Sequence, residues 1–219
     1  MNKALPILLV VTMLLTSCKK DNEESVKWID LGLPSGLLWA DRNLGATTPE
    51  EYGDEFPWGE TTGRHATWWE WDWDNYLYGS SSNSLTKYCN NPEYGLNGFT
   101  DNRTQLESCD DAATVLLGSG SHTPTKDDWQ ELIDNTTYTV SGRGAYFTAA
   151  NGKSIYLPYG YFFYDGKYMS CSLYEEDPSC AYYFFEGGND SWVNNSPLCV
   201  SVRERCSSFP VRAVRSSRQ

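Results

Sequence analysis

The sequence predicts an α+β domain that has few short helices, antiparallel hairpins and a strand-rich carboxyl-terminal half. Three observations lead to this fold class. The segment from Thr125 to Asn135 has the pattern of a capped amphipathic helix, and the chain after it is rich in aromatic and β-branched residues. Three turn dipeptides interrupt that later part, and such dipeptides join neighbouring antiparallel strands: Asn151-Gly152, Asp165-Gly166 and Gly187-Gly188.

The first expected elements are a hairpin and a short helix. Val26 to Leu31 and Leu37 to Asp41 are apolar runs on either side of Pro34-Ser35-Gly36, a sequence typical of a turn between two strands. Residues 48–52, Thr-Pro-Glu-Glu-Tyr, place a capping residue, a proline in the first turn and acids near the amino end, which predicts a short helix.

The helix from Thr125 to Asn135 carries the clearest signals. Thr125 is suited to cap it, and Asp127 and Asp128 lie near its positive end. Its buried stripe, at positions i, i+3 and i+4, is expected to consist of Trp129, Leu132 and Ile133. Each of the three runs that follow, AYFTAANGKSIYLPY, YFFYDGKYM and AYYFFEGGNDSWV, predicts a hairpin around its turn dipeptide.

The amino terminus has the pattern of an export segment. Lys3 supplies a positive charge, and the apolar run from Ala4 to Leu15 is shorter than the roughly 20 residues that a membrane-spanning helix needs. The run ends in Leu15-Thr16-Ser17-Cys18, which resembles the lipobox of bacterial lipoproteins, whose cysteine is lipidated and becomes the first mature residue. Cys18 is therefore the expected lipidation site, and its acyl chains would anchor the protein in a membrane.

The remaining chain predicts one domain. Residues 1–17 form the signal peptide, 18–25 a polar tether, 26–215 the domain and 216–219 a tail. The acidic stretch after Cys18 resembles a surface-export signal, so we expect an outer membrane lipoprotein exposed at the cell surface, with the periplasmic face as the alternative. The formal net charge of −12 repels phosphate backbones, which makes nucleic acid a poor candidate partner.

Several cysteines follow Cys18, and an exported protein lies where disulfides persist. The sequence alone does not fix their pairing. The loop between Cys89 and Cys109 is full of turn-forming residues that a disulfide would order, so these two are the candidate pair. Zinc would need closely spaced cysteine pairs with histidines in register, and His65 and His122 lie near no such pair. We expect no metal and no other cofactor.

One stretch, ATWWEWDWDNY, places Trp69, Trp71 and Trp73 at every second position with acids between them. The alternation favours an extended segment whose tryptophans pack on the body of the domain while the carboxylates face water. A sugar-stacking platform and a calcium loop are the alternatives. The spacing of the acids suits calcium, but no turn glycine follows before Gly79.

Five motifs follow one another from about Trp28 to Arg215. They are WIDLGLPSGLLWADRNLGATTPEEYGDEFPWGET, LTKYC, DDAATVLLGSGSHTPTKDDWQELIDN, GKSIYLPYGYF and the closing FPVRAVR. Together they resemble the Fibrobacter succinogenes major paralogous domain, which is common in exported lipoproteins and is similar to the formylglycine-generating-enzyme type of C-type-lectin-like fold. The resemblance implies that fold but not one function, because a fold carries many kinds of site.

The resemblance also implies an enzymatic alternative, a cysteine and copper oxidase. Formylglycine-generating relatives use a carboxyl-terminal cysteine pair that binds copper, and Cys199 and Cys206 lie in the corresponding region. Arg203 and Arg205 would lower the pKa of a thiol there. The spacing and neighbours of the two cysteines depart from that family's motif, and no Ser-His-Asp nucleophile motif is recognisable. We therefore expect no enzymatic activity.

The stretch from Tyr168 to Ser208 is rich in Tyr, Asn, Ser, Asp and Cys, a composition typical of adaptable binding surfaces. C-type-lectin-like domains often bind ligands on this late, loop-rich face. The stretch also resembles variable regions diversified by retroelements, and a fixed tail of ordinary β composition is the alternative.

We expect this stretch to bind an extracellular protein or glycan, with a structural role as an adhesin or appendage subunit as another alternative. The candidate ligand-binding residues are Tyr168, Tyr174, Tyr183, Phe185, Asn189, Trp192, Asn194, Asn195, Cys199 and Arg205, whereas Tyr182 and Phe184 are expected to be buried strand residues.

Overall fold

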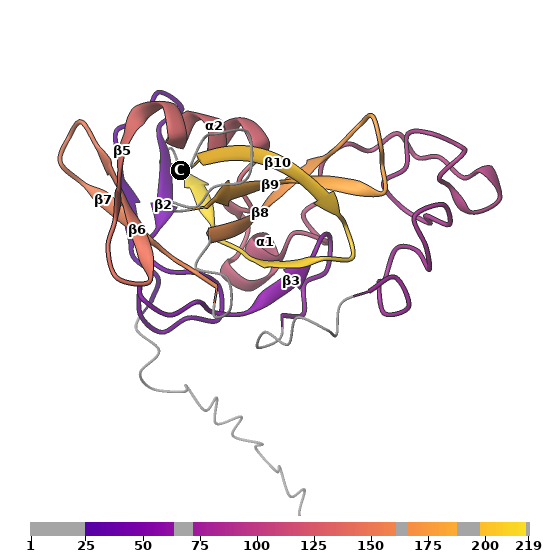
Figure 1. The fold of residues 1–219 in the computed structure, drawn as a ribbon, viewed down its shortest axis with the longest axis horizontal. Coiled ribbons are helices and arrows are strands. Elements are labelled where there is room, and N and C mark those ends of the chain that lie inside the picture. Colours follow the sequence, from indigo (N-terminus) through magenta and orange to yellow (C-terminus); the bar gives the residue numbers. More distant parts are fainter. Residues whose placement is uncertain (1–24, 64–71, 161–165, 188–197, 218–219) are drawn as a thin grey trace, which may run out of the picture.

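The computed structural model describes residues 25–63, 72–160, 166–187 and 198–217. In these residues the protein is mostly β, with two short helices and several small antiparallel sheets (Figure 1). The hairpins expected at residues 26–41 and around Asn151-Gly152 and the strand-rich carboxyl-terminal half are confirmed, but the helices are too short for an α+β class. The expected signal peptide, Cys18 and most of the expected tether lie outside the described residues. No helix of the described part is long and apolar enough to cross a membrane.

The two ends of the described chain meet in one sheet. β1 (Trp28–Asp30) and β2 (Leu37–Ala40) form the predicted hairpin, and Gly36 lies in its turn at a φ of 70°, which glycine adopts without strain. β12 (Val214–Ser216) pairs with the other edge of β2, and β4 (Ser121–His122) pairs with β12.

The second helix begins as predicted. In α2 (Lys126–Asn135) the hydroxyl of Thr125 accepts from the backbone N–H of Asp128 at 3.1 Å, and the Asp128 carboxylate accepts from the N–H of Thr125 at 2.8 Å. The apolar stripe packs inward as expected, with Trp129 and Leu132 fully buried. The first helix, α1 (Ala112–Leu117), is capped by the buried Asp111, which also accepts from Thr123 near β4.

The short helix expected at residues 48–52 is wrong, because these residues form a turn. The Glu51 carboxylate turns back to accept from the backbone N–H of Thr47 at 2.6 Å and from its hydroxyl at 2.9 Å. A side chain that binds nearby backbone in this way offers the chain an alternative to helical hydrogen bonds.

A three-stranded sheet follows α2 directly. β5 (Thr136–Val140), β6 (Gly144–Ala149) and β7 (Ser154–Pro158) pair in that order. The predicted hairpin around Asn151-Gly152 is confirmed as β6 and β7, with Gly152 at a φ of 79°. β5 was not predicted as a separate strand, because its Thr-Thr-Tyr-Thr-Val sequence follows the helix directly and no turn residue marks a boundary.

The central sheet has the order β10-β9-β8, made by β10 (Leu198–Glu204), β9 (Cys180–Glu186) and β8 (Gly166–Leu173). Glu186 pairs with Leu198, so the chain between β9 and β10 runs from 187 to 197 instead of through the expected two-residue Gly187-Gly188 turn. Gly166 is the first residue of β8, and the chain just before it, 161–165, lies outside the described residues.

The central sheet separates two hydrophobic cores. Phe184 of β9 lies in one core, where it stacks on Trp129 of α2 with ring centroids 4.7 Å apart. Tyr183 lies in the other core and stacks on Phe209 at 5.0 Å. That second core also includes Phe56, since β3 (Glu55–Pro57) pairs with β11 (Ser208–Pro210) beside it.

Figure 1 shows how these parts are arranged. The β5-β6-β7 sheet lies on one side of the central sheet, and α2 lies above it. On the opposite side are the loops of residues 72–110, whose regular structure is one short 3-10 turn, Leu96–Gly98.

Candidate ligand-binding surface

Four of the ten residues predicted to contact ligand are buried. Tyr168 is 0 % exposed, Tyr183 8 %, Phe185 7 % and Arg205 1 %. For these residues the prediction is wrong. The strands that carry the first three lie between two cores, so both rows of side chains on β9 are covered and the usual alternation of buried and exposed positions fails.

Arg205 has a structural place. Its guanidinium lies over the rings of Trp58 at 5.2 Å and Tyr76 at 5.4 Å and donates to the backbone oxygens of Tyr88 at 2.8 Å and Lys87 at 3.1 Å. These contacts join the end of β10 to the loops of residues 72–110. Arg205 is thus a buried structural residue and not part of an exposed binding surface.

Two of the predicted residues remain partly accessible, Tyr174 and Cys199. The other four, Asn189, Trp192, Asn194 and Asn195, lie outside the described residues. Cys199 lies on β10, which is an edge strand of the central sheet.

Tyr174 belongs to a small surface that we call the aromatic patch, formed by Tyr174, Tyr182, Lys126 and Val202. The ring of Tyr174 meets that of Tyr182 edge to face at 5.5 Å, and the Lys126 ammonium lies 4.9 Å from the Tyr182 ring centroid. Val202 pairs with Tyr182 across the strands and is 37 % exposed. The patch therefore combines aromatic, aliphatic and cationic groups on accessible side chains.

The polar ends of the patch are fixed by local contacts. The Tyr174 hydroxyl donates to the Glu176 carboxylate at 2.6 Å, and this bond, together with partial burial, raises the pKa of Tyr174 to about 12. The phenol is therefore neutral at physiological pH. Beside it, Asn90 donates to the backbone oxygen of Glu175 at 2.9 Å and ties the turn after β8 to the 72–110 loops.

Sequence reasoning missed three members of the patch. Tyr182 was expected to be a buried strand residue, but it is only half-buried. Lys126 was not predicted, because in the sequence it is simply the first residue of a well-capped helix. Its contact with Tyr182 joins elements that are far apart in the chain. The alternation in β10 gave a weak signal for Val202.

The disulfide expected between Cys89 and Cys109 is not formed, and both are free thiols. Cys89 is buried and donates to the backbone oxygen of Asn91 at 3.0 Å, whereas Cys109 is exposed. The loop between them is ordered by another group. The Asp101 carboxylate accepts from the backbone N–H groups of Tyr88 and Cys89, each at 2.9 Å.

The carboxyl-terminal cysteines lack the features of an activated thiol. Burial, followed by the nearby Glu204, raises the pKa of Cys206 to about 11, and burial also raises the pKa of Cys199. Arg205, which was expected to help lower a thiol pKa, instead directs its guanidinium to the 72–110 loops. These thiols are protonated at neutral pH.

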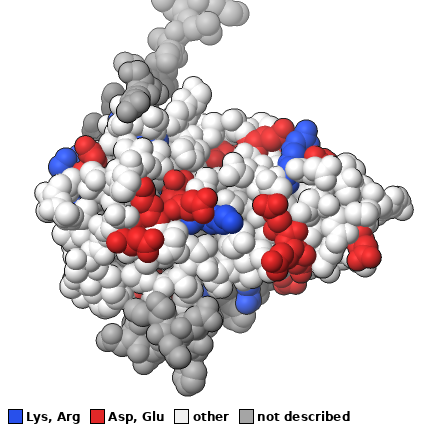
Figure 2. Space-filling model, turned by 90° about the horizontal axis from the view of Figure 1, so that it is seen from above, with Lys and Arg blue, Asp and Glu red and all other residues white. Residues whose placement is uncertain are grey.

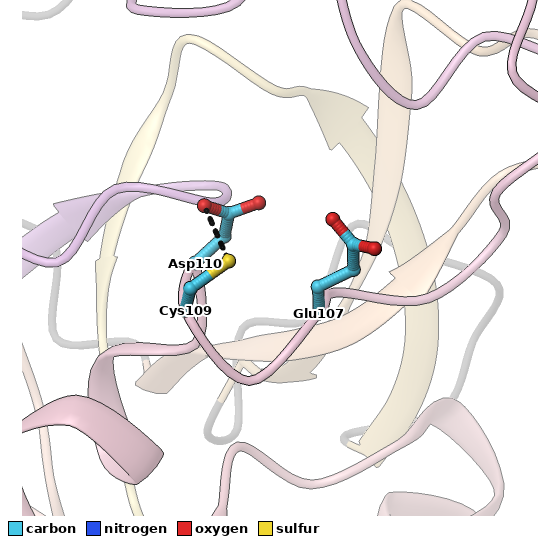
Figure 3. Close-up of side chains that lie close together, drawn as sticks. All are labelled: Glu107, Cys109 and Asp110. Atoms are coloured by element: carbon cyan, nitrogen blue, oxygen red, sulfur yellow. Dashed lines mark hydrogen bonds between the residues drawn. The ribbon is translucent and has the colours of Figure 1, made fainter.

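A cluster of possible metal ligands lies just before α1. Glu107, Cys109 and Asp110 offer atoms within 4.8 Å of one another, and Figure 3 shows the three side chains on one loop, with the Cys109 thiol next to the Asp110 carboxylate. The carboxylates are already engaged. Lys87 contacts Asp110 and lies 2.8 Å from Glu107, and Tyr78 and Tyr88 both donate to Asp110. A cation would have to displace the Lys87 ammonium, so the donor set does not suit one.

The tryptophan stretch is described only in part, because Trp69 and Trp71 lie outside the described residues. Trp73 packs edge to face on the buried Tyr76 at 5.5 Å, and Tyr76 donates to the backbone oxygen of Trp58 at 2.8 Å. Trp73 is half-buried and meets the domain through this contact, but residues 72–75 form a turn instead of the expected extended segment.

The molecular surface reflects the acidic composition. Figure 2 looks onto the molecule from above Figure 1, and acidic side chains gather there in several groups with few basic ones among them. Lys126 therefore gives the aromatic patch a positive charge on a protein whose net charge is negative.

Comparisons of the chain with protein-family models, curated proteins and solved structures return no match.

Proposed function

We propose that this protein is an outer membrane lipoprotein, exposed at the cell surface, whose domain binds an extracellular protein or glycan through its carboxyl-terminal, loop-rich face. The aromatic patch carries the proposal. It is an accessible group of Tyr and aliphatic side chains within the described residues, and it contains Tyr174, one of the residues that the sequence pointed to. The scaffold we propose is the C-type-lectin-like fold.

Contacts between the sequence motifs support this scaffold. Arg212 of the closing FPVRAVR donates to Asn43 of the first motif at 2.8 Å, across 169 residues of chain. Trp58 of WGET donates to the backbone oxygen of Ser170 at 2.9 Å, and Trp129 of the helix motif donates to that of Met169 at 3.0 Å. The motif residues thus hold one another and the central sheet in place.

The chemistry of the patch favours a protein ligand at this position. Tyrosine gives a large contact area at low cost in conformational entropy, and it is enriched among the side chains that dominate binding energy. A lysine above one ring and a valine beside it add a charge and an apolar contact. The thiol pKa values described above give no support to the oxidase alternative.

The anchor and the ligand can be tested on the same protein. Wild-type protein should partition into detergent and label with fatty acid, and Cys18→Ala should lose both properties. If Cys18→Ala still labels and stays membrane-bound, the lipoprotein assignment fails. Protease treatment of intact cells should remove the domain if it faces outward and should spare it if it faces the periplasm.

An array of extracellular proteins and glycans, probed with detergent-solubilised full-length protein, tests the binding site. A captured ligand should bind the double variant Tyr174→Ala/Tyr182→Ala about tenfold more weakly, equivalent to about 1.4 kcal/mol. Tyr94→Ala, which removes another partly exposed tyrosine, should bind like the parent. Equal binding by the double variant would remove the patch from the site. Copper-dependent and thiol-dependent oxygen consumption would favour the oxidase instead.

A further inference from the structure

The outer side of the β5-β6-β7 sheet carries an ordered array of hydroxyl groups. Cross-strand pairing places Thr137, Thr148 and Ser154 in one row and Thr139, Tyr146 and Tyr156 in the next. Paired residues in an antiparallel sheet share a face, so these six side chains lie on one side. We call this surface the hydroxyl face. Its opposite side packs into the core through residues such as Phe147 and Leu157.

In the second row, two tyrosines form an aromatic surface whose position is fixed by packing and by a hydrogen bond. The rings of Tyr146 and Tyr156 lie 4.9 Å apart, and Tyr146 is 40 % exposed. The Tyr156 ring lies over Gly144, where an added Cβ would be 2.5 Å from its Cζ atom. Its hydroxyl donates to the backbone oxygen of Ser141 at 3.1 Å. The missing side chain at Gly144 therefore makes room for a ring that lies against the sheet.

The other hydroxyls of the array are available to a ligand. Those of Thr137, Thr139, Thr148, Ser154 and Tyr146 make no hydrogen bond within the described part of the chain. Neighbouring strands lie about 4.8 Å apart, and alternate residues along a strand about 6.8 Å apart, so the hydroxyls stand at regular intervals on a fixed grid. Each can both donate and accept.

A groove deepens one end of the array. It has a volume of about 330 Å³ and is lined by the end of α2, the start of β5 and the end of β6. Thr137 and Thr148 belong both to this groove and to the first row of hydroxyls. Asp134 and Asn135 add a carboxylate and an amide. The surface is therefore a continuous polar strip with a concave end.

We propose that the hydroxyl face binds a neutral glycan, with a sugar ring against Tyr146 and sugar hydroxyls bonded to the threonine and serine rows. Rows of hydroxyls beside an aromatic surface match the mixed polar and apolar faces of a sugar ring. The six side chains of the face are uncharged. The groove contributes the acidic Asp134, and Glu50 places a negative charge near Tyr156, which disfavours acidic glycans. This site is on a different sheet from the aromatic patch and does not depend on it.

Affinity electrophoresis of the detergent-solubilised full-length protein tests the proposal. The gels contain mixed-linkage β-glucan, xyloglucan or galactomannan as neutral probes, and polygalacturonate as the acidic probe. At least one neutral probe should retard the protein, and polygalacturonate should not. Tyr146→Ala should bind the neutral probe about tenfold more weakly. The double variant Thr137→Val/Thr148→Val keeps side-chain shape and should also bind more weakly.

Two controls separate this site from other causes. Tyr94→Ala should be retarded like the parent, and so should the patch variant Tyr174→Ala/Tyr182→Ala. Near-ultraviolet circular dichroism should show that each variant is folded. The proposal is overturned if no neutral probe retards the parent, if polygalacturonate retards it equally, or if Tyr146→Ala is retarded as strongly as the parent.

Discussion

Arg212 shows how much one buried side chain can hold together. Its guanidinium donates to Asn43 Oδ1 at 2.8 Å, to the Ala40 carbonyl at 3.1 Å and to the Tyr156 carbonyl at 2.9 Å. It thus ties β2 and the loop after it to β7. Burial lowers the pKa of Arg212 to about 10, which is still well above neutral pH, so the side chain remains charged.

We expect Arg212→Lys to lower the free energy of unfolding by about 3 kcal/mol, because an ammonium cannot reach three acceptors spread around a planar guanidinium and leaves buried oxygens unpaired. Urea denaturation measures the change. The matched control is Arg215→Lys, at a half-buried arginine that lies 4.5 Å from the Trp28 ring and should cost less than about 1 kcal/mol. Similar losses in both variants would contradict the role given to Arg212.

The same scale explains why four of the ten candidate site residues were mispredicted. Tyr183 and Phe185 have the sequence pattern of an exposed row that alternates with the buried Phe184. That interpretation assumes a sheet with one face exposed to solvent. Phe209 and Phe56, from distant segments, cover this second face, and the local sequence gives no sign of it. Arg205 was mispredicted for a related reason, since its aromatic partners Trp58 and Tyr76 are far away in the chain.

At the scale of elements, α2 depends on its capping box. Thr125→Ala should lower the free energy of unfolding by about 1 to 2 kcal/mol, because the N–H of Asp128 loses its acceptor. Thr125→Ser should retain most of the stability. Gln130→Ala, at an exposed position of the same helix, should change it by less than about 0.5 kcal/mol. Chemical denaturation of the three variants would show whether the cap or general helix propensity matters.

Elements with local signals were predictable, and those made by distant partners were not. The β1-β2 hairpin, α2 and the β6-β7 hairpin each carry their own turn or cap, at Gly36, Thr125 and Asn151-Gly152. The two-residue strand β4 exists because β12 pairs with it, and its own sequence is Ser-His. β10 begins after a connection longer than its glycine pair suggested, since a turn dipeptide marks where a loop starts and not how far it runs.

For the whole molecule, acid should weaken the contacts that hold the 72–110 loops together. Burial alone would raise the pKa of Asp110, but hydrogen bonds from Lys87, Tyr88 and Tyr78 outweigh it and lower the pKa below the usual 3.8. A carboxyl whose pKa is lowered by folding stabilises the folded state above its unfolded pKa. This stability is lost as the pH falls through the lower, folded value.

We therefore expect Asp110→Asn to be less stable than the parent by about 2 kcal/mol at pH 7, because the buried Tyr88 and the half-buried Lys87 and Tyr78 lose their charged acceptor. The difference should shrink as the pH falls below 3.8. Thermal melts between pH 7 and pH 2.5 measure it. Asp74→Asn, at an exposed position, should follow the parent throughout. A constant difference across this range would mean that the carboxylate charge is not the source of the stability.

The place of β1 at the edge of its sheet has a mechanical consequence. If the chain is anchored through Cys18 as proposed, force on the domain would reach β1 first, and among the described strands this three-residue strand pairs only with β2. Peeling it away would leave β2 bound to β12 and Trp39 in the core, and would stop at Leu31, whose side chain is 1 % exposed. Under load the chain would then lengthen by the few residues of β1 while the two proposed binding surfaces stayed folded.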